Sequence, residues 1–202
     1  MKNTIVVMSS NREMERQTAE SLTELAKLGA IRLLESGSPD VAFSRCRALS
    51  WTCDQLREHP ERDMVLMVDD DMVIAGETAQ IVVEQSRRLQ IPCSAAYTTV
   101  NAMLAAERLP TGLWLAGLGC LAIPRAVLLD LEQRSESFEN SGVVYSAFTW
   151  CGPENGKWIA EDFRLCRRLG GVKLLPVMVG HVKKWELWPD DEAMAGIGAM
   201  SK

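Results

Sequence analysis

Apolar and polar positions follow two different periods along the first half of the chain. The β-branched run Thr4–Ser10 predicts a strand, whereas Arg12–Leu28 carries leucines at helical spacing and ends before Gly29, which predicts a helix. Asp63–Val68 is continuously apolar after its first residue, as in a central strand that is buried on both faces. The same patterns mark a second apolar run at Ala30–Glu35, a strand at Pro92–Thr99, and helices at Val41–Leu56 and Ala75–Leu89.

The second half of the chain is less regular. Gly112–Ile123 is glycine-rich and apolar, and Pro124–Leu131 predicts a helix with a proline in its first turn. Trp158–Leu169 predicts another helix, which stops at two glycines, and Lys173–Val182 predicts a late strand. The stretch between the two helices, Glu136–Trp158, has the composition of a loop.

Alternation of strands with helices indicates an α/β fold, with a mostly parallel central sheet flanked by helices. The pattern contains no internal repeat, low-complexity segment or linker. A chain of 202 residues is long enough to bury a full core without metals or disulfides. We therefore expect a single domain over residues 1–202.

Composition narrows the class of protein further. The formal net charge is −5, which argues against an overall basic nucleic-acid binder but permits a local basic face. No apolar run approaches the roughly 20 residues of a membrane span, and the amino-terminal stretch turns charged too early for a signal peptide. The six cysteines form no C-x-x-C pair, so we expect buried thiols in a reducing cytoplasm rather than zinc or redox chemistry.

Three consecutive aspartates, Asp69, Asp70 and Asp71, follow the apolar strand directly. Aspartate is depleted in strands, and α/β proteins bind ligands beyond the carboxyl ends of their strands. Carboxylates this close repel one another unless a cation lies near them, and Mg²⁺ or Mn²⁺ shared with substrate phosphates suits such oxygen ligands. The alternative is a solvated acidic turn that leads into the next helix.

Three chemistries place acidic residues after a buried strand. A P-loop NTPase also needs G-x-x-x-x-G-K-[ST], and Gly152–Lys157 (GPENGK) has the wrong spacing. Asp69–Val73 (DDDMV) matches the D-x-D-x-[TV] of haloacid-dehalogenase-type phosphatases, but in that family the motif lies on the first strand. The third chemistry uses the D-x-D of nucleotide-sugar transferases.

Four segments in one order carry a family resemblance. They are Ser44–Leu49 (SRCRAL), Met64–Met72 (MVLMVDDDM), Gly117–Arg125 (GLGCLAIPR), and Ala160–Leu169 (AEDFRLCRRL) followed by Gly180-His181. Together they cover most of the chain from about residue 41 to 183, and this order resembles the GT-A glycosyltransferases, in particular small family-2-like enzymes of bacteria and phages. Ala48 departs from the asparagine that this family often has, and Lys183 stands where a glycine often follows the histidine.

The resemblance implies a Rossmann-like GT-A domain that uses a nucleoside-diphosphate sugar, with UDP-sugar as the expected donor. Residues 1–100 would form the nucleotide-binding half, and residues 101–202 would form the acceptor-side half with the metal-binding histidine and the carboxyl-terminal tail. Mn²⁺ or Mg²⁺ would be held by Asp71 and His181 and would neutralise the diphosphate as the bond to the sugar breaks. Asp162 would be the catalytic base, with Glu161 as the second candidate for that role or for acceptor binding.

Contacts to the donor are expected from the aspartate motif, the helix that precedes it and the segments around it. Each of these residues also has a structural alternative, because a histidine can sit in a core, a carboxylate can open a helix and a glycine can make a turn. Lys183 would point the same way as His181 in an extended chain. The expected donor-binding residues are Asp69, Asp70, Arg45, Arg47, Lys183 and Gly119.

The sequence thus favours a metal-dependent glycosyltransferase that acts on a hydroxyl acceptor. The basic segment Arg164–Lys184 and the tryptophans Trp150 and Trp158 suit a polyanion, which makes a hydroxymethylated DNA base one acceptor hypothesis and a glycan the other. An Mg²⁺-dependent phosphatase and a non-catalytic nucleotide- or nucleic-acid-binding module are the competing functions. A phage-encoded enzyme of this kind would work in the host cytoplasm.

Overall fold

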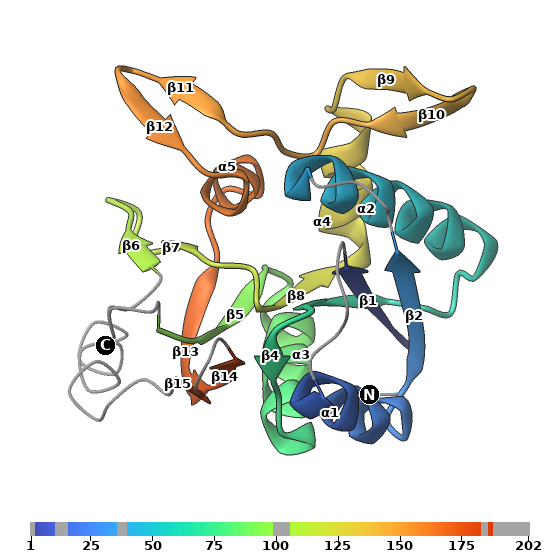
Figure 1. The fold of residues 1–202 in the computed structure, drawn as a ribbon, viewed down its shortest axis with the longest axis vertical. Coiled ribbons are helices and arrows are strands. Elements are labelled where there is room, and N and C mark those ends of the chain that lie inside the picture. The colour runs from blue at the N-terminus through green and yellow to red at the C-terminus, as the bar shows by residue number, and fades with distance from the viewer. Residues whose placement is uncertain (1–2, 11–15, 36–39, 99–105, 183–185, 188–202) are drawn as a thin grey trace.

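A six-stranded sheet forms the centre of the protein. The computed structural model describes residues 3–10, 16–35, 40–98, 106–182, 186 and 187 (Figure 1). The strands lie in the order β13-β5-β8-β3-β1-β2, and β8 is antiparallel to both of its neighbours, whereas the other pairs are parallel. Their bounds are β1 (Thr4–Ser10), β2 (Ala30–Glu35), β3 (Met64–Asp69), β5 (Cys93–Ala96), β8 (Cys120–Pro124) and β13 (Lys173–Met178).

Helices cover both faces of this sheet. Side chains of β3 alternate between two cores: Val65 and Met67 pack on the side of α2, α4 and α5, and Leu66 and Val68 pack on the side of α1 and α3. A strand buried on both faces explains the unbroken apolar run that the sequence shows. The helices are α1 (Arg16–Ala26), α2 (Val41–Glu58), α3 (Gly76–Leu89), α4 (Arg125–Gln133) and α5 (Glu161–Arg168).

The predicted α/β class with a mostly parallel sheet is confirmed. Each predicted helix is present within a few residues of its expected bounds, although residues 11–15 of the first one lie outside the described residues. Strands from both predicted halves of the chain share the sheet, because β8 lies between β3 and β5. No helix among the described residues is long and apolar enough to cross a membrane.

The expectation of a loop over Glu136–Trp158 is wrong. This stretch contains two β-hairpins that project from the helical layer (Figure 1). Their turns place Ser141, Gly142, Asn155 and Gly156 at positive φ, a backbone geometry that matches the twist of two-residue hairpins. The sequence Asn155-Gly156 could have been recognised as the turn of a hairpin. The strands are β9 (Ser137–Asn140), β10 (Val143–Ser146), β11 (Gly152–Glu154) and β12 (Lys157–Ile159).

The predicted late strand Lys173–Val182 is divided in two. Its first part is β13, an edge strand of the central sheet, where Pro176 costs no ladder hydrogen bond and the register with β5 shifts after Leu174. Its second part leaves that sheet and joins a separate three-stranded one. The smaller strands are β14 (Gly180–Val182), β4 (Met72–Val73), β15 (Glu186–Leu187), β6 (Ala106–Arg108) and β7 (Trp114–Ala116).

Candidate functional site

The aspartate triplet lies where β3 ends and the chain turns into β4. Asp69 is the last residue of β3, and Asp70 and Asp71 follow it in a turn, with each of these two residues only 7% exposed. β14 pairs antiparallel with β4, and the Val182 amide donates to the Asp71 carbonyl at 2.7 Å. This pairing brings His181 to the triplet across more than one hundred residues of sequence.

His181 is fixed through both of its ring nitrogens. Nδ1 lies 3.3 Å from the carbonyl oxygen of Thr98, and Nε2 lies 3.2 Å from Oδ2 of Asp71. A carbonyl can only accept, so a hydrogen bond to Thr98 requires the proton on Nδ1. In a neutral ring, the lone pair of Nε2 then faces a carboxylate oxygen. That contact is favourable only when a proton or a metal cation lies between the two atoms.

Arg45 of α2 reaches the carboxylates from the opposite side. Its Nη2 donates to both oxygens of Asp69, at 3.0 and 3.2 Å, and lies 3.8 Å from Oε1 of Glu161. Burial alone would lower the pKa of the Arg45 guanidinium, but Asp69, Glu161 and Asp162 together raise it. The helix therefore contributes a permanently charged, buried cation at the end of β3.

Glu161 and Asp162 open α5, whose N-cap Ala160 provides no side-chain hydrogen bond. Oδ1 of Asp162 accepts from the Phe163 amide at 2.7 Å. Burial raises the pKa of Asp162 to about 6, Arg45 lowers it, and Glu161 raises it further. Asp162 is thus a carboxylate with more than ordinary basicity, next to a fixed guanidinium.

Tyr97 and Thr98 belong to the site, although the sequence analysis did not select them. The Tyr97 ring meets the His181 ring edge-on, with 5.4 Å between centroids. Burial, together with the charges of Asp69 and Asp162, raises the pKa of Tyr97 and keeps its hydroxyl neutral. Their position in the sequence could have indicated them, because both residues directly follow strand β5, at the carboxyl edge of the sheet where ligands bind in α/β proteins.

Two buried polar atoms at the site lack a hydrogen-bond partner within the described part of the chain. They are Nη1 of Arg45 and the hydroxyl oxygen of Thr98. Buried polar groups are nearly always satisfied, so each is a place where a ligand or water would bind. Arg45 and Thr98 also contact predicted site residues through other atoms: Arg45 donates to Asp69, and the Thr98 carbonyl lies next to His181.

The charge of the site favours a cation. Three carboxylates, those of Asp69, Glu161 and Asp162, act on the Arg45 guanidinium, and two more, those of Asp70 and Asp71, act on Asp69. Burial raises the pKa of Asp69, and after the opposing effect of Arg45 its neighbours Asp71 and Asp70 raise it further. Over the described ranges, no three His, Cys, Asp or Glu side chains form a ready-made metal cage. A cation at this place would have two protein ligands, Asp71 and His181, and would need further ligands from substrate phosphates or water.

The remaining predicted site residues lie as follows. Arg47 is half-buried on α2, and two residues of helix turn it away from the direction of Arg45. The Gly119 carbonyl accepts from the Asp69 amide at 3.4 Å, and a Cβ on Gly119 would come within 2.8 Å of the Met72 sulfur. Packing thus accounts for this glycine, and its contact with a donor sugar stays a prediction. Lys183 lies outside the described residues.

No known protein-family profile matches the chain, and no curated protein sequence matches it. Among solved structures, A197 from STIV is similar over 93% of this chain and 94% of its own length, with a TM-score of 0.59 and 13% sequence identity. A similarity at this identity shows a shared fold.

Two further solved structures have names that state an activity. A glycosyltransferase involved in the glycosylation of the major capsid of PBCV-1 matches 63% of this chain and 62% of its own, at a TM-score of 0.41 and 12% identity. A 4-diphosphocytidyl-2C-methyl-D-erythritolsynthase from Anaerococcus prevotii matches 97% and 96%, at a TM-score of 0.44 and 12% identity. At these scores neither likeness decides the function of this chain.

Proposed function

We propose that this protein is a metal-dependent glycosyltransferase, which moves a sugar from a nucleoside-diphosphate sugar to a hydroxyl acceptor. The contact between Asp71 and His181 carries the proposal. The Thr98 carbonyl orients the ring so that Nε2 faces a carboxylate, which is how a histidine ligand and its acidic neighbour are arranged around a divalent ion.

The donor set fits Mn²⁺ or Mg²⁺. One carboxylate and one imidazole leave most of the coordination to phosphate oxygens and water, as these ions commonly require in nucleotide sites. When bound, the ion would supply positive charge to the leaving diphosphate. Asp71 and His181 would hold it, and Asp70, buried beside them, would add negative charge to the site.

Asp162 is proposed as the base that takes the proton from the acceptor hydroxyl. A pKa of about 6 leaves this carboxylate ionised at neutral pH and more basic than an exposed aspartate. Arg45 holds Asp69 and lies beside Glu161, which keeps the neighbouring carboxylates in place while Asp162 reacts. A single displacement assisted by one base would invert the anomeric configuration of the sugar.

The donor is proposed to be a UDP-sugar that lies beside Asp69 and the free Nη1 of Arg45. An N–H donor without a partner in the described residues suits an oxygen of the ribose or the diphosphate. Glu161 is proposed to contact the acceptor, for which a hydroxymethylated DNA base remains the hypothesis and a glycan the alternative.

The phosphatase alternative receives no support from the site. Such an enzyme uses the first aspartate of its motif as a nucleophile, and here that residue is Asp69. Both oxygens of Asp69 accept from Arg45, so neither is directed freely at a phosphorus atom. The triplet also follows the third strand of the chain rather than the first.

Donor binding by an Asp71→Asn variant tests the proposal. We expect the wild-type protein to bind UDP in the presence of Mn²⁺ in a calorimetric titration, and we expect the variant to lose this metal-dependent binding without unfolding. Loss of one charge from a crowded set of carboxylates should relieve repulsion in the free protein. Asp54→Asn, an exposed change on α2, is the matched control. Unchanged UDP affinity in Asp71→Asn would refute the metal assignment.

A further inference from the structure

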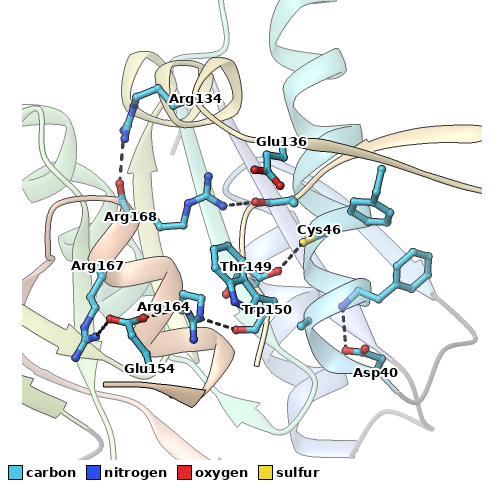
Figure 2. Close-up of a pocket in the computed structure, with 14 residues that line it drawn as sticks. Asp40, Cys46, Arg134, Glu136, Thr149, Trp150, Glu154, Arg164, Arg167 and Arg168 are labelled. Carbon is cyan, nitrogen blue, oxygen red and sulfur yellow. Dashed lines mark hydrogen bonds and ion pairs between the residues drawn. The ribbon is translucent and has the colours of Figure 1, made fainter. Parts of the chain in front are cut away.

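The site around Asp69, Asp71, Asp162 and His181 is called the carboxylate site below. A cavity that shares no lining residue with it opens between α2, α5 and the β9–β10 hairpin. Its volume is about 860 Å³, within the usual size range of small-molecule sites. Figure 2 shows the side chains of Arg164, Arg167 and Arg168 from α5 gathered on one side of it, with Arg134 above and Trp150 in the middle. None of the residues that line it belongs to the carboxylate site, so the following inference does not depend on the proposed function.

Four arginines gather at the cavity and differ in how their charge is balanced. Four guanidiniums and three carboxylates line it, and Asp130, which lies outside the lining, pairs with Arg134 at 2.8 Å. Arg164 and Arg167 share a single carboxylate, that of Glu154, at 2.9 and 2.6 Å. Of the other two acids, Asp40 caps α2 by accepting from the Phe43 amide, and Glu136 acts on Arg168 without forming an ion pair with it.

Arg168 is the lining arginine that forms no ion pair with a described residue, whereas Arg134, Arg164 and Arg167 each form one. It donates to two neutral acceptors, the Ala147 carbonyl and, at 2.8 Å, the Ser135 hydroxyl, and no described carboxylate forms an ion pair with it. Burial lowers the pKa of Arg168 and the nearby Arg134 lowers it further, although Cys46 and Glu136 partly oppose this shift. An anion in the cavity would therefore gain a charge-assisted contact without first breaking an ion pair.

Aromatic rings form the other part of the lining. Phe43 and Phe138 contact each other with 6.0 Å between ring centroids, and Tyr145 packs against both. Trp150 is 46% exposed, and the Arg164 guanidinium lies over its ring at 4.4 Å. Flat apolar surfaces beside guanidiniums are the features with which proteins bind nucleotides, because the bases stack and the phosphates pair.

We propose that this cavity binds a nucleotide unit, with the phosphate beside Arg168 and the base against the rings of Phe43 and Phe138. A free nucleoside monophosphate and a nucleotide within a single strand share this chemistry. Both hairpins contribute to the lining of the cavity, through Phe138 of β9 and Glu154 of β11, so a single strand bound here would contact the protein outside the carboxylate site.

Binding of three probes tests the proposal: thymidine 5′-monophosphate, a short oligothymidylate and inorganic phosphate. The titrations are made with EDTA present, so that metal-dependent donor binding does not contribute, and tryptophan fluorescence or calorimetry reports binding. We expect the monophosphate, the oligomer or both to bind more tightly than phosphate, with an affinity that falls as salt rises. The preference between monophosphate and oligomer distinguishes the free from the polymeric source.

Two substitutions should change the affinity in opposite directions. Arg168→Gln should weaken nucleotide binding by about tenfold, the effect of one charge-assisted contact. Glu154→Gln should strengthen it, because Arg164 and Arg167 lose the carboxylate that competes with the ligand. Since opposite shifts do not arise from a general loss of folding, the pair keeps the test valid even if Arg168→Gln is less stable.

The aromatic half and the control complete the experiment. Phe138→Leu should weaken binding of the nucleotides and leave that of phosphate unchanged. Arg88→Gln, on α3 at the opposite face of the sheet, removes an exposed arginine and should leave every affinity unchanged. The proposal is overturned if no nucleotide binds, if Arg168→Gln and Arg88→Gln have equal effects, or if phosphate binds as tightly as the nucleotides.

Discussion

At the scale of single residues, Asp162 shows how surroundings set reactivity. Its carboxylate is partly buried at the start of α5, near Glu161 and Asp69, and the positive charge of Arg45 only partly offsets the effect of this environment on its pKa. The result is a pKa of about 6. A base with this pKa is ionised at neutral pH and still holds a proton well enough to accept one during transfer.

The Asp162→Asn variant should separate binding from chemistry. We expect it to bind donor and metal like the wild-type protein, and to transfer sugar about 10² to 10⁴ times more slowly, which is the usual contribution of a positioned base. Wild-type transfer should rise with pH and level off above about 6, as Asp162 loses its proton. A steady-state assay across pH measures the rate of transfer by the variant and the pH dependence of the wild-type protein. Near-normal turnover, or a product with retained configuration, would assign Asp162 another role.

The same variant should be more stable than the wild-type protein. Because the folded-state pKa of Asp162 lies above its ordinary value of 3.8, the folded protein binds this proton more tightly than the unfolded chain, and stability falls as pH rises from about 4 to about 6. At pH 7 the penalty is present in full, so removing the charge should raise the free energy of unfolding by about 1–2 kcal/mol. Denaturant titrations at pH 7 and pH 4 measure this, and the gain should vanish at pH 4.

His181 provides the third prediction at this scale. His181→Ala should raise the Mn²⁺ concentration needed for half-maximal UDP binding by at least about tenfold, while the protein stays folded. The reason is that Asp71 would remain without the nitrogen that lies 3.2 Å from it. His59→Ala, which removes the other, partly exposed histidine, is the control. A His181→Ala protein that is insoluble, or one that folds and needs no more Mn²⁺ than the wild type, would make this histidine a core residue.

At the scale of elements, the sequence predicted what depends on local pattern. The unbroken apolar run of β3 and the helical spacing of α3 both appear as expected. For the second half of the chain, the prediction was wrong where the strands are short. The strands of each hairpin have three or four residues, too few for an alternation of apolar and polar residues to be visible. The sequence could not show that β14 is separate from β13, because this separation depends on the pairing of β14 with β4, which lies more than a hundred residues earlier.

Gly117, in the connection between β7 and β8, tests how tightly this site is packed. A Cβ there would overlap the Tyr97 hydroxyl and ring. Gly117→Ala should therefore lower the free energy of unfolding by about 1–3 kcal/mol, the usual cost of overpacking. Denaturant titration measures this, with the buried Gly152→Ala, where the nearest contact is an ordinary 3.9 Å, as the control. The cost should shrink in a Tyr97→Ala background; an equal cost there would mean that Tyr97 is not the obstacle.

At the scale of the whole molecule, the site joins segments whose contacts sequence alone could not reveal. The sequence predicted Asp71 and His181 as partners through a family resemblance, and the structure places them in contact. The hydrogen bonds of Arg45 to both oxygens of Asp69 had no sequence signal beyond the positions of the residues. Tyr97 was missed because its place in the site depends on a ring contact between the segment after β5 and His181 of β14.

The packing of the two cores predicts which thiols can react. Cys46, Cys53 and Cys166 are buried on the α2 side of the sheet, and Cys93 and Cys120 are buried on the α3 side. Cys151 is exposed. An aromatic disulfide reagent should therefore label one thiol of the native protein quickly and all six only after denaturation, because buried thiols must wait for the structure to open.

Cys151 also reports on the candidate active site. Its thiol donates to Oε2 of Glu161 at 3.3 Å, and burial together with the negative charge of Glu161 raises the pKa of Cys151. Glu161→Gln should therefore speed the labelling of Cys151 at pH 8, since more of the thiol would be ionised. Cys151→Ser must abolish the fast phase, which confirms its origin, and Glu139→Gln on the exposed β9 strand should leave the rate unchanged. If Glu161→Gln labels no faster than Glu139→Gln, the carboxylate does not control this thiol, and the arrangement of Glu161 at the start of α5 is different in solution.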